Sequence, residues 1–74
     1  MYKVSCRFNF ANGDISSDVA KCDLPQEAIA LINKMIGIFG PINERNVNRI
    51  MDMQPGDKVK FRIAKLVSVS VKCK

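Results

Sequence analysis

The last third of the chain alternates between apolar and polar residues with a period of two. Between residues 58 and 72 the apolar positions are Val59, Phe61, Ile63, Val67, Val69 and Val71, and the polar ones are Lys58, Lys60, Arg62, Ser68, Ser70 and Lys72. Successive side chains of a strand point to opposite faces. The pattern therefore predicts β structure with one apolar face and one cationic face.

This alternation slips in the middle, at Ala64-Lys65-Leu66. Lys65 takes an apolar position there and Leu66 a polar one. A β-bulge would leave one long bent strand, whereas a tight reversal would make two antiparallel strands. We favour the reversal, which gives the protein four strands instead of three.

Residues 2–10 show the same alternation at the start of the chain. Tyr2, Val4, Cys6, Phe8 and Phe10 alternate with Lys3, Ser5, Arg7 and Asn9. Asn12-Gly13 follows and predicts a hairpin with a type I′ turn, in which both central residues need positive φ. The return strand, from residue 14 to about residue 21, is polar, so we expect it at an edge of the sheet.

The middle of the chain predicts a long helix. Asp23 is the expected N-cap, because Pro25 stands in the first turn and Gln26 follows three residues after the cap. Apolar residues then recur at spacings of three and four up to Gly40-Pro41, a pair that ends helices. These residues are Ala28, Leu31, Ile32, Met35 and Phe39.

A second, shorter helix is predicted from Asn43, whose side chain can cap it. Val47, Ile50 and Met51 form its apolar stripe. The segment Gln54-Pro55-Gly56-Asp57 has the composition of a type II turn, with Pro and Gly at the two central positions. This turn would lead the chain into the final strands.

The predicted order of elements is ββααβ(β), which is typical of a two-layer α+β domain with an antiparallel sheet packed on the helices. The 74 residues form one domain, 1–74. The expected core consists of Val4, Phe8, Phe10, Leu31, Ile32, Met35, Val59, Phe61 and Ile63.

Positive charge gathers at one end of the sequence. The net charge is +5, and residues 58–74 contain six basic residues and no acidic one. A compact basic domain suits an anionic partner, although an ordinary solvated surface is the alternative. If the two alternating segments share one sheet, its uncovered face collects Lys3, Arg7, Lys58, Lys60, Arg62 and Lys72, and Arg45 and Arg49 of the second helix could supplement them.

The sequence does not favour an enzyme. It contains no histidine, no glycine-rich phosphate loop and no carboxylate pair at a recognisable spacing. The three cysteines, Cys6, Cys22 and Cys73, match no metal or redox motif, so we expect reduced cysteines and neither metal nor cofactor. No apolar run is long enough for a signal peptide or a membrane span, so we expect a cytoplasmic protein without a membrane partner.

Two functions fit these observations. The first is a basic binding module that acts on nucleic acid or on a nucleic-acid-handling complex. Phe8, Phe10 and Phe61 share the apolar positions, so the cationic face would contact phosphates and not stack on bases. The alternative is a phage-type accessory or inhibitor protein, anti-CRISPR or anti-restriction in style, that blocks a host complex by protein contact. A free sheet edge could also form a homodimer.

Overall fold

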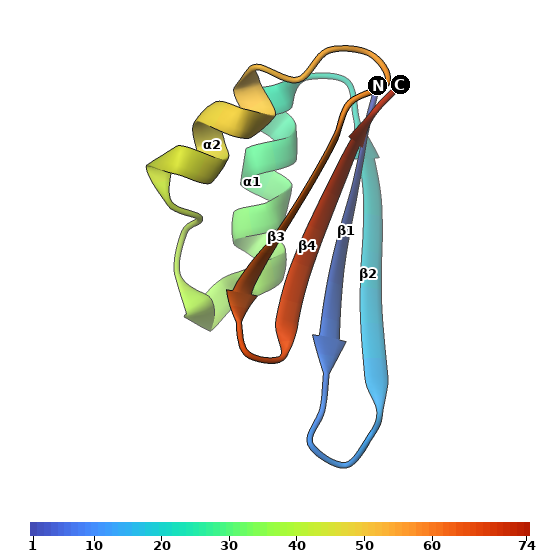
Figure 1. Ribbon diagram of the computed structural model, residues 1–74, viewed down its shortest axis with the longest axis vertical. Coiled ribbons are helices and arrows are strands. Elements are labelled where there is room, and N and C mark those ends of the chain that lie inside the picture. Colours follow the sequence, from blue (N-terminus) through green and yellow to red (C-terminus); the bar gives the residue numbers. More distant parts are fainter.

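A computed structural model describes residues 1–74, except for the side chain of Ile38. The order of elements is ββααββ, with four antiparallel strands in one sheet and both helices on the same side of it (Figure 1). The elements are β1 (Tyr2–Asn9), β2 (Ile15–Cys22), α1 (Pro25–Ile36), the 3-10 turn η1 (Gly37–Phe39), α2 (Glu44–Met51), β3 (Lys58–Ala64) and β4 (Val67–Cys73). The predicted two-layer α+β fold is confirmed, in its four-stranded form.

The order of strands across the sheet is β2-β1-β4-β3. The first and last strands of the chain are therefore neighbours at its centre. Their register pairs Val4 with Val71 and Cys6 with Val69. All four side chains are buried against the helices, because they share the face that the helix layer covers.

The first hairpin is present, but its turn differs from the prediction. Phe10 N–H donates to the Asp14 carbonyl (2.8 Å) and Gly13 N–H to the Phe10 carbonyl (3.0 Å), so the loop has three residues. Gly13 has positive φ (94°), and Asn12 does not. The Asn12 side chain instead accepts a hydrogen bond from Asp14 N–H at 3.0 Å. The type I′ prediction was wrong, and the geometry fits a type I turn followed by a glycine in the left-handed region.

The second hairpin reverses tightly at Lys65 and Leu66, between β3 and β4. This confirms the preferred interpretation of the slip in the alternation. The register also shifts within β3: Arg62 pairs with Ser68, but Ala64 pairs with Val67. The reversal is therefore accompanied by an irregularity that leaves Ile63 without a direct partner.

The start of α1 corrects the predicted cap. Pro25 is the first helical residue, Leu24 is the N-cap in extended conformation (φ −118°, ψ 146°), and no side chain caps the helix. Asp23 lies one residue too early. Proline at the first helical position has no N–H to leave unpaired and has φ already near the helical value, so the helix begins there. The helix ends at Ile36, where Gly37 adopts positive φ, so Phe39 lies in the 3-10 turn and not in α1.

The remaining turns agree with the sequence. Asn43 Oδ1 accepts the Asn46 N–H at 2.9 Å, which confirms the predicted cap of α2. Asp57 N–H donates to the Gln54 carbonyl at 2.9 Å, and Gly56 has a φ of 95°. These are the features of the predicted type II turn.

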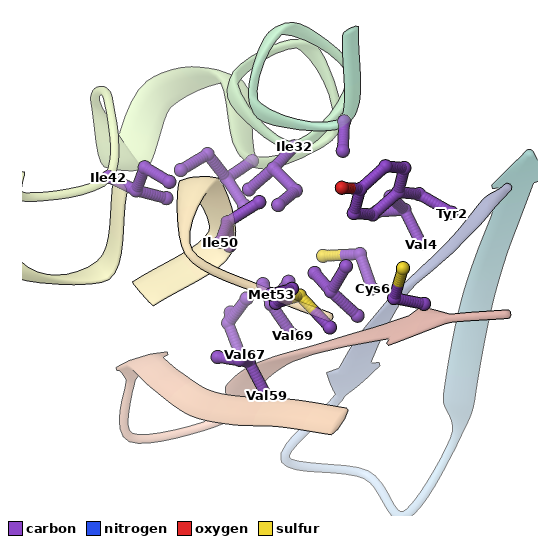
Figure 2. Packing of buried hydrophobic residues seen from close by; sticks show 14 residues of the cluster. Tyr2, Val4, Cys6, Ile32, Ile42, Ile50, Met53, Val59, Val67 and Val69 are labelled. Carbon is purple, nitrogen blue, oxygen red and sulfur yellow. The ribbon is translucent and has the colours of Figure 1, made fainter. Parts of the chain in front are cut away.

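The core lies between the sheet and the two helices, and Figure 2 shows side chains from both layers meeting there. Part of the predicted core is correct: Val4, Ile32 and Val59 are buried, and Phe8, Met35, Phe61 and Ile63 pack partly buried against it. Phe10 is 53% exposed, because the tip of the β1–β2 hairpin extends beyond the helices (Figure 1). Leu31 is only half-buried.

Eleven residues outside the expected core list are also buried: Tyr2, Cys6, Ala28, Ile36, Ile42, Ile50, Met53, Val67, Val69, Val71 and Cys73. Most of them occupy apolar positions of the predicted strands and helices, whereas Ile42, Met53 and Cys73 lie outside those patterns. Ile42 is held in place because its N–H donates to Asn33 Oδ1 of α1 at 3.0 Å. Among the described helices, none has the length and apolar character that crossing a membrane requires.

Candidate functional site

The helices leave one face of the sheet uncovered, and we call it the open face. It carries alternate residues of all four strands: Lys3, Ser5 and Arg7 of β1, Ser17, Val19 and Lys21 of β2, Lys58, Lys60 and Arg62 of β3, and Ser68, Ser70 and Lys72 of β4. Intervening residues such as Val4, Val59 and Val69 are buried toward the helices. In β1, β3 and β4 the period-two pattern thus separates apolar from cationic side chains, as predicted, whereas in β2 the apolar Ile15 and Val19 lie on the open face.

Four lysines form a row straight across the open face. In strand order, Lys21 of β2 pairs with Lys3 of β1, Lys3 pairs with Lys72 of β4, and Lys72 pairs with Lys58 of β3. We call these four residues the lysine row. Neighbouring strands are about 4.8 Å apart, so the row spans roughly 14 Å between its outer backbones. Like charges directly opposite each other destabilise a sheet. The row therefore lowers the stability of the fold.

Serines occupy the central strands beyond the lysine row. Ser5 pairs with Ser70 and Arg7 with Ser68, while Lys60 and Arg62 lie outside them on β3. An open depression of about 330 Å³ lies over this area, lined by Ser5, Arg7, Ser17, Val19, Lys60, Ser68 and Ser70 among others. A smaller one of about 140 Å³ adjoins the lysine row. Short hydroxyl side chains between long cationic ones let an anionic group approach the sheet closely.

The open face contains no acidic residue at any of these positions. Asp18 belongs to β2, but it pairs with Cys6 and so lies on the helix side. Among the described side chains, none of the seven cations of the open face donates a hydrogen bond to a carboxylate; the hydrogen bond from a basic side chain is that of Arg49 to Asn46. These seven cations are Lys3, Arg7, Lys21, Lys58, Lys60, Arg62 and Lys72. Their charge is therefore available to an external anion.

The structure brings together six of the eight predicted site residues. Lys3, Arg7, Lys58, Lys60, Arg62 and Lys72 all lie on the open face. Arg45 and Arg49 are exposed on α2, in the helix layer, and Arg49 Nη1 contacts Asn46 Oδ1 at 3.5 Å. They are separated from the open face by the thickness of the sheet, so the predicted supplement is not part of this surface.

Sequence reasoning missed Lys21, and it placed Ser5, Ser68 and Ser70 at the polar positions without counting them as site residues. A type I′ turn at Asn12-Gly13 would have paired Lys21 with Val4, on the helix side of the sheet. The three-residue loop shifts β2 by one residue and pairs Lys21 with Lys3. Because a shift of one residue moves every side chain of a strand to the other face, the turn decides whether the lysine row has three members or four.

The cysteines and Tyr2 lie on or near the helix side of the sheet and are not part of the open face. Burial raises the pKa of the Cys6 thiol, and the Asp18 carboxylate adds to this effect. Burial also raises the pKa of Cys22, with further contributions from Glu27 and Asp23. The pKa of Tyr2 is raised by burial and by the neighbouring Cys73. The Cys6 and Cys22 thiols therefore stay protonated at neutral pH, which makes them poor nucleophiles.

Comparison of the chain with protein-family models, with curated proteins and with solved structures finds no match. Any function proposed for the open face therefore depends on the residues of that face alone. The feature that distinguishes it is the lysine row, with hydroxyl groups beside it and carboxylates excluded from the same face. Such a surface has the chemistry of an anion-binding site whose ligand carries several negative charges.

Proposed function

We propose that the protein binds the phosphate backbone of nucleic acid through the open face. The lysine row is the observation that carries this proposal, because four ammonium groups in line suit a ligand with regularly repeated charges. Lysine and arginine neutralise phosphates and release the counterions condensed on them, which drives binding without reading sequence. The serine hydroxyls can donate further hydrogen bonds to phosphate oxygens.

The expected mode is contact with the backbone. Phe8 and Phe61 belong to the helix side of the sheet, and Tyr2 is buried in the core, so no aromatic ring of these strands is on the open face. Proteins that bind single strands tightly usually stack bases on such rings. The open face supplies cations and hydroxyl groups instead, which favours binding with little sequence preference. Binding of this kind needs neither catalysis nor a cofactor.

The test is a titration across salt concentrations. Fluorescence anisotropy with labelled duplex DNA, duplex RNA and single-stranded DNA of mixed sequence should give affinities that fall between 50 and 200 mM salt. For duplex DNA, a ligand that covers the lysine row should show a log–log slope of about −4 or steeper. No binding to any of these probes at 50 mM salt would contradict the proposal and leave an acidic protein surface as the partner of the open face.

Two double variants with the same change in net charge locate the site. Lys3→Gln with Lys72→Gln removes the middle of the lysine row, and Arg45→Gln with Arg49→Gln removes two cations from α2. The first should weaken binding at least tenfold and reduce the salt slope by about two. The second should leave the slope nearly unchanged. Equal losses in both variants would show that total charge, and not the open face, is responsible.

A further inference from the structure

The outer side of β2 is an uncovered sheet edge. Phe10 N–H donates to the Asp14 carbonyl, so Phe10 and Asp14 form a hydrogen-bonded pair. Hydrogen-bonded and non-hydrogen-bonded pairs alternate along an antiparallel ladder. The backbone N–H and C=O groups of Ser16, Asp18, Ala20 and Cys22 therefore point toward β1. Ser17, Val19 and Lys21 direct their N–H and C=O groups away from it. Asn9 N–H, which donates to the Leu66 carbonyl on the other side of β1, agrees with this alternation.

This edge has little protection against pairing. It contains no proline, and its residues from Ile15 to Val19 are exposed. Val19, in the middle of its outward-pointing positions, is 57% exposed. Natural edge strands are usually blocked by prolines, bulges or several charges, whereas Lys21 is the one cation among these outward-pointing residues. The strand is therefore open to pairing with another strand.

On the helix side, the exposed flank of α1 lies beside this edge. Together they form one strip, which consists of Ser17, Val19 and Lys21 of β2 and Glu27, Leu31 and Lys34 of α1. A depression of about 410 Å³ is lined by Asp18 and Val19 of β2 and by Leu31, Lys34 and Met35 of α1. Toward the other end of β2, a second depression involves Lys21, Cys22, Glu27, Ala30, Leu31 and Lys34. Leu31 is thus level with the middle of β2, with Glu27 and Lys34 on either side of it. This position explains why Leu31 is only half-buried despite its place in the apolar stripe.

We propose that this strip is the interface of a homodimer in which β2 pairs antiparallel with β2 of a second copy. The two-fold axis passes beside Val19, so that Val19 faces Val19 of the second copy and Ser17 faces Lys21. On the helix side Asp18 faces Ala20. Ser17, Val19 and Lys21 then exchange backbone hydrogen bonds with the other strand.

Registers with the axis at another residue of β2 are less favourable. Reciprocal bonds form whenever two outward-pointing residues face each other, so the axis can pass any residue of β2. An axis at Asp18 places two carboxylates opposite each other, which is destabilising. An axis at Ala20 shortens the ladder, because β2 ends at Cys22. An axis at Lys21 places two lysines opposite each other, which is destabilising. An axis at Ile15 or Ser17 carries part of β2 past the end of its partner strand and into the loop at Gly13, which shortens the ladder. The axis at Val19 pairs two exposed valines and no like charges.

The exposed flanks of the two α1 helices are complementary in charge under the same two-fold symmetry. A two-fold axis at Val19 brings Leu31 toward Leu31 of the second copy and exchanges the two ends of the strip. Glu27 therefore approaches Lys34 of the other copy, twice in the dimer. The axis is perpendicular to the sheet, so the dimer has one eight-stranded sheet with both open faces on the same side. The inference depends on β2 and α1 alone and is independent of the proposed function.

The experiment is a measurement of mass in solution, without nucleic acid, by sedimentation or light scattering from about 1 µM to 1 mM chain. We expect the mass to rise toward twice 8.3 kDa. Val19→Pro should weaken dimerisation at least tenfold, because it removes two intermolecular N–H donors from the dimer, one in each copy. The N–H of Val19 is not used in pairing with β1, so the monomer should keep its fold, as circular dichroism can verify.

A charge exchange keeps the test decisive if Val19→Pro fails to fold. Glu27→Lys should weaken the dimer by placing lysines opposite Lys34, and Lys34→Glu should weaken it by placing carboxylates opposite Glu27. The double variant Glu27→Lys with Lys34→Glu should restore it. A wild-type protein that stays monomeric at 1 mM, a dimer unaffected by Val19→Pro, or a double variant no stronger than the single ones would each overturn the proposal.

Discussion

Lys3 and Lys72 lie directly opposite each other on the two central strands of the sheet, and Lys72 has a second lysine, Lys58, on its other side. No carboxylate on the same face offsets this arrangement. Cross-strand neighbours of like charge destabilise a sheet, so the stability of the fold and its capacity to bind an anion oppose each other here. The first two predictions follow from this relationship.

Lys72→Glu should stabilise the protein while weakening nucleic-acid binding. The new carboxylate would lie between Lys3 and Lys58 and replace two repulsive pairs by two attractive ones, which is worth about 0.5–1 kcal/mol. Urea unfolding measures the stability, and anisotropy measures the binding. The control is Lys65→Glu in the β3–β4 turn, which changes the net charge equally away from the lysine row. A similar gain in stability from both variants would contradict the local explanation.

Added salt should raise the free energy of unfolding of the wild-type protein, because ions screen the repulsion within the lysine row. The rise should be smaller in Lys72→Glu, where attraction is screened as well. Unfolding midpoints in urea at 20 mM and 500 mM sodium chloride provide the measurement. If the two proteins respond equally to salt, the repulsion does not come from this row.

The two candidate helix caps should behave differently when they are truncated. Asn43→Ala removes the acceptor for Asn46 N–H and should lower the free energy of unfolding by about 0.5–2 kcal/mol. Asp23→Ala removes no capping hydrogen bond, because the N-cap of α1 is Leu24, so its effect should be much smaller. Urea unfolding of the two variants side by side tests this. A larger loss in Asp23→Ala would mean that α1 begins at the residue predicted from sequence.

Alkaline pH should destabilise the protein. In the unfolded chain the thiols titrate at their ordinary pKa of 9.0, whereas burial raises the pKa of Cys6 and Cys22 in the folded chain. The folded state therefore holds protons that the unfolded state has released, and the free energy of unfolding falls as pH rises through 9. It should be constant below that range. Unfolding in urea at several pH values from 7 to 9.5, in the presence of a reductant, measures the fall, and Cys22→Ala should reduce it. Stability that increases over this interval would contradict the prediction.

The sequence predicted the fold well where the alternation was regular. β1, β3 and β4 have strict period-two patterns, and the slip at Lys65 and Leu66 marked where the pattern breaks. The slip left a bulge and a reversal both open, and the structure contains the reversal together with a register irregularity in β3. Six cations of the open face followed directly from that pattern. The two-layer arrangement followed as well, since only one face of each strand is apolar.

What the sequence did not determine depends on geometry at turns and on tertiary contacts. The choice between a two- and a three-residue loop at Gly13 is a local matter of φ values, yet it decides which face of the sheet Lys21 occupies. Phe10 fits the apolar pattern of β1 but lies beyond the reach of the helices. Leu31 fits the stripe of α1, but the position of the helix over the sheet leaves it beside the β2 edge. Such outcomes require the relative placement of elements, which periodicity does not contain.

The adjacency of β1 and β4 has a consequence for how the chain reaches this state. Each hairpin can form from residues close in sequence, but the contact between Val4 and Val71 joins nearly opposite ends of the chain. Closing so large a loop is entropically unfavourable and must precede the gain from the central pairing. We therefore expect the middle of the sheet, where the lysine row crosses it, to assemble late and by contacts of the longest range. Removing a few residues from either end would cost the protein its central strands and not its edges.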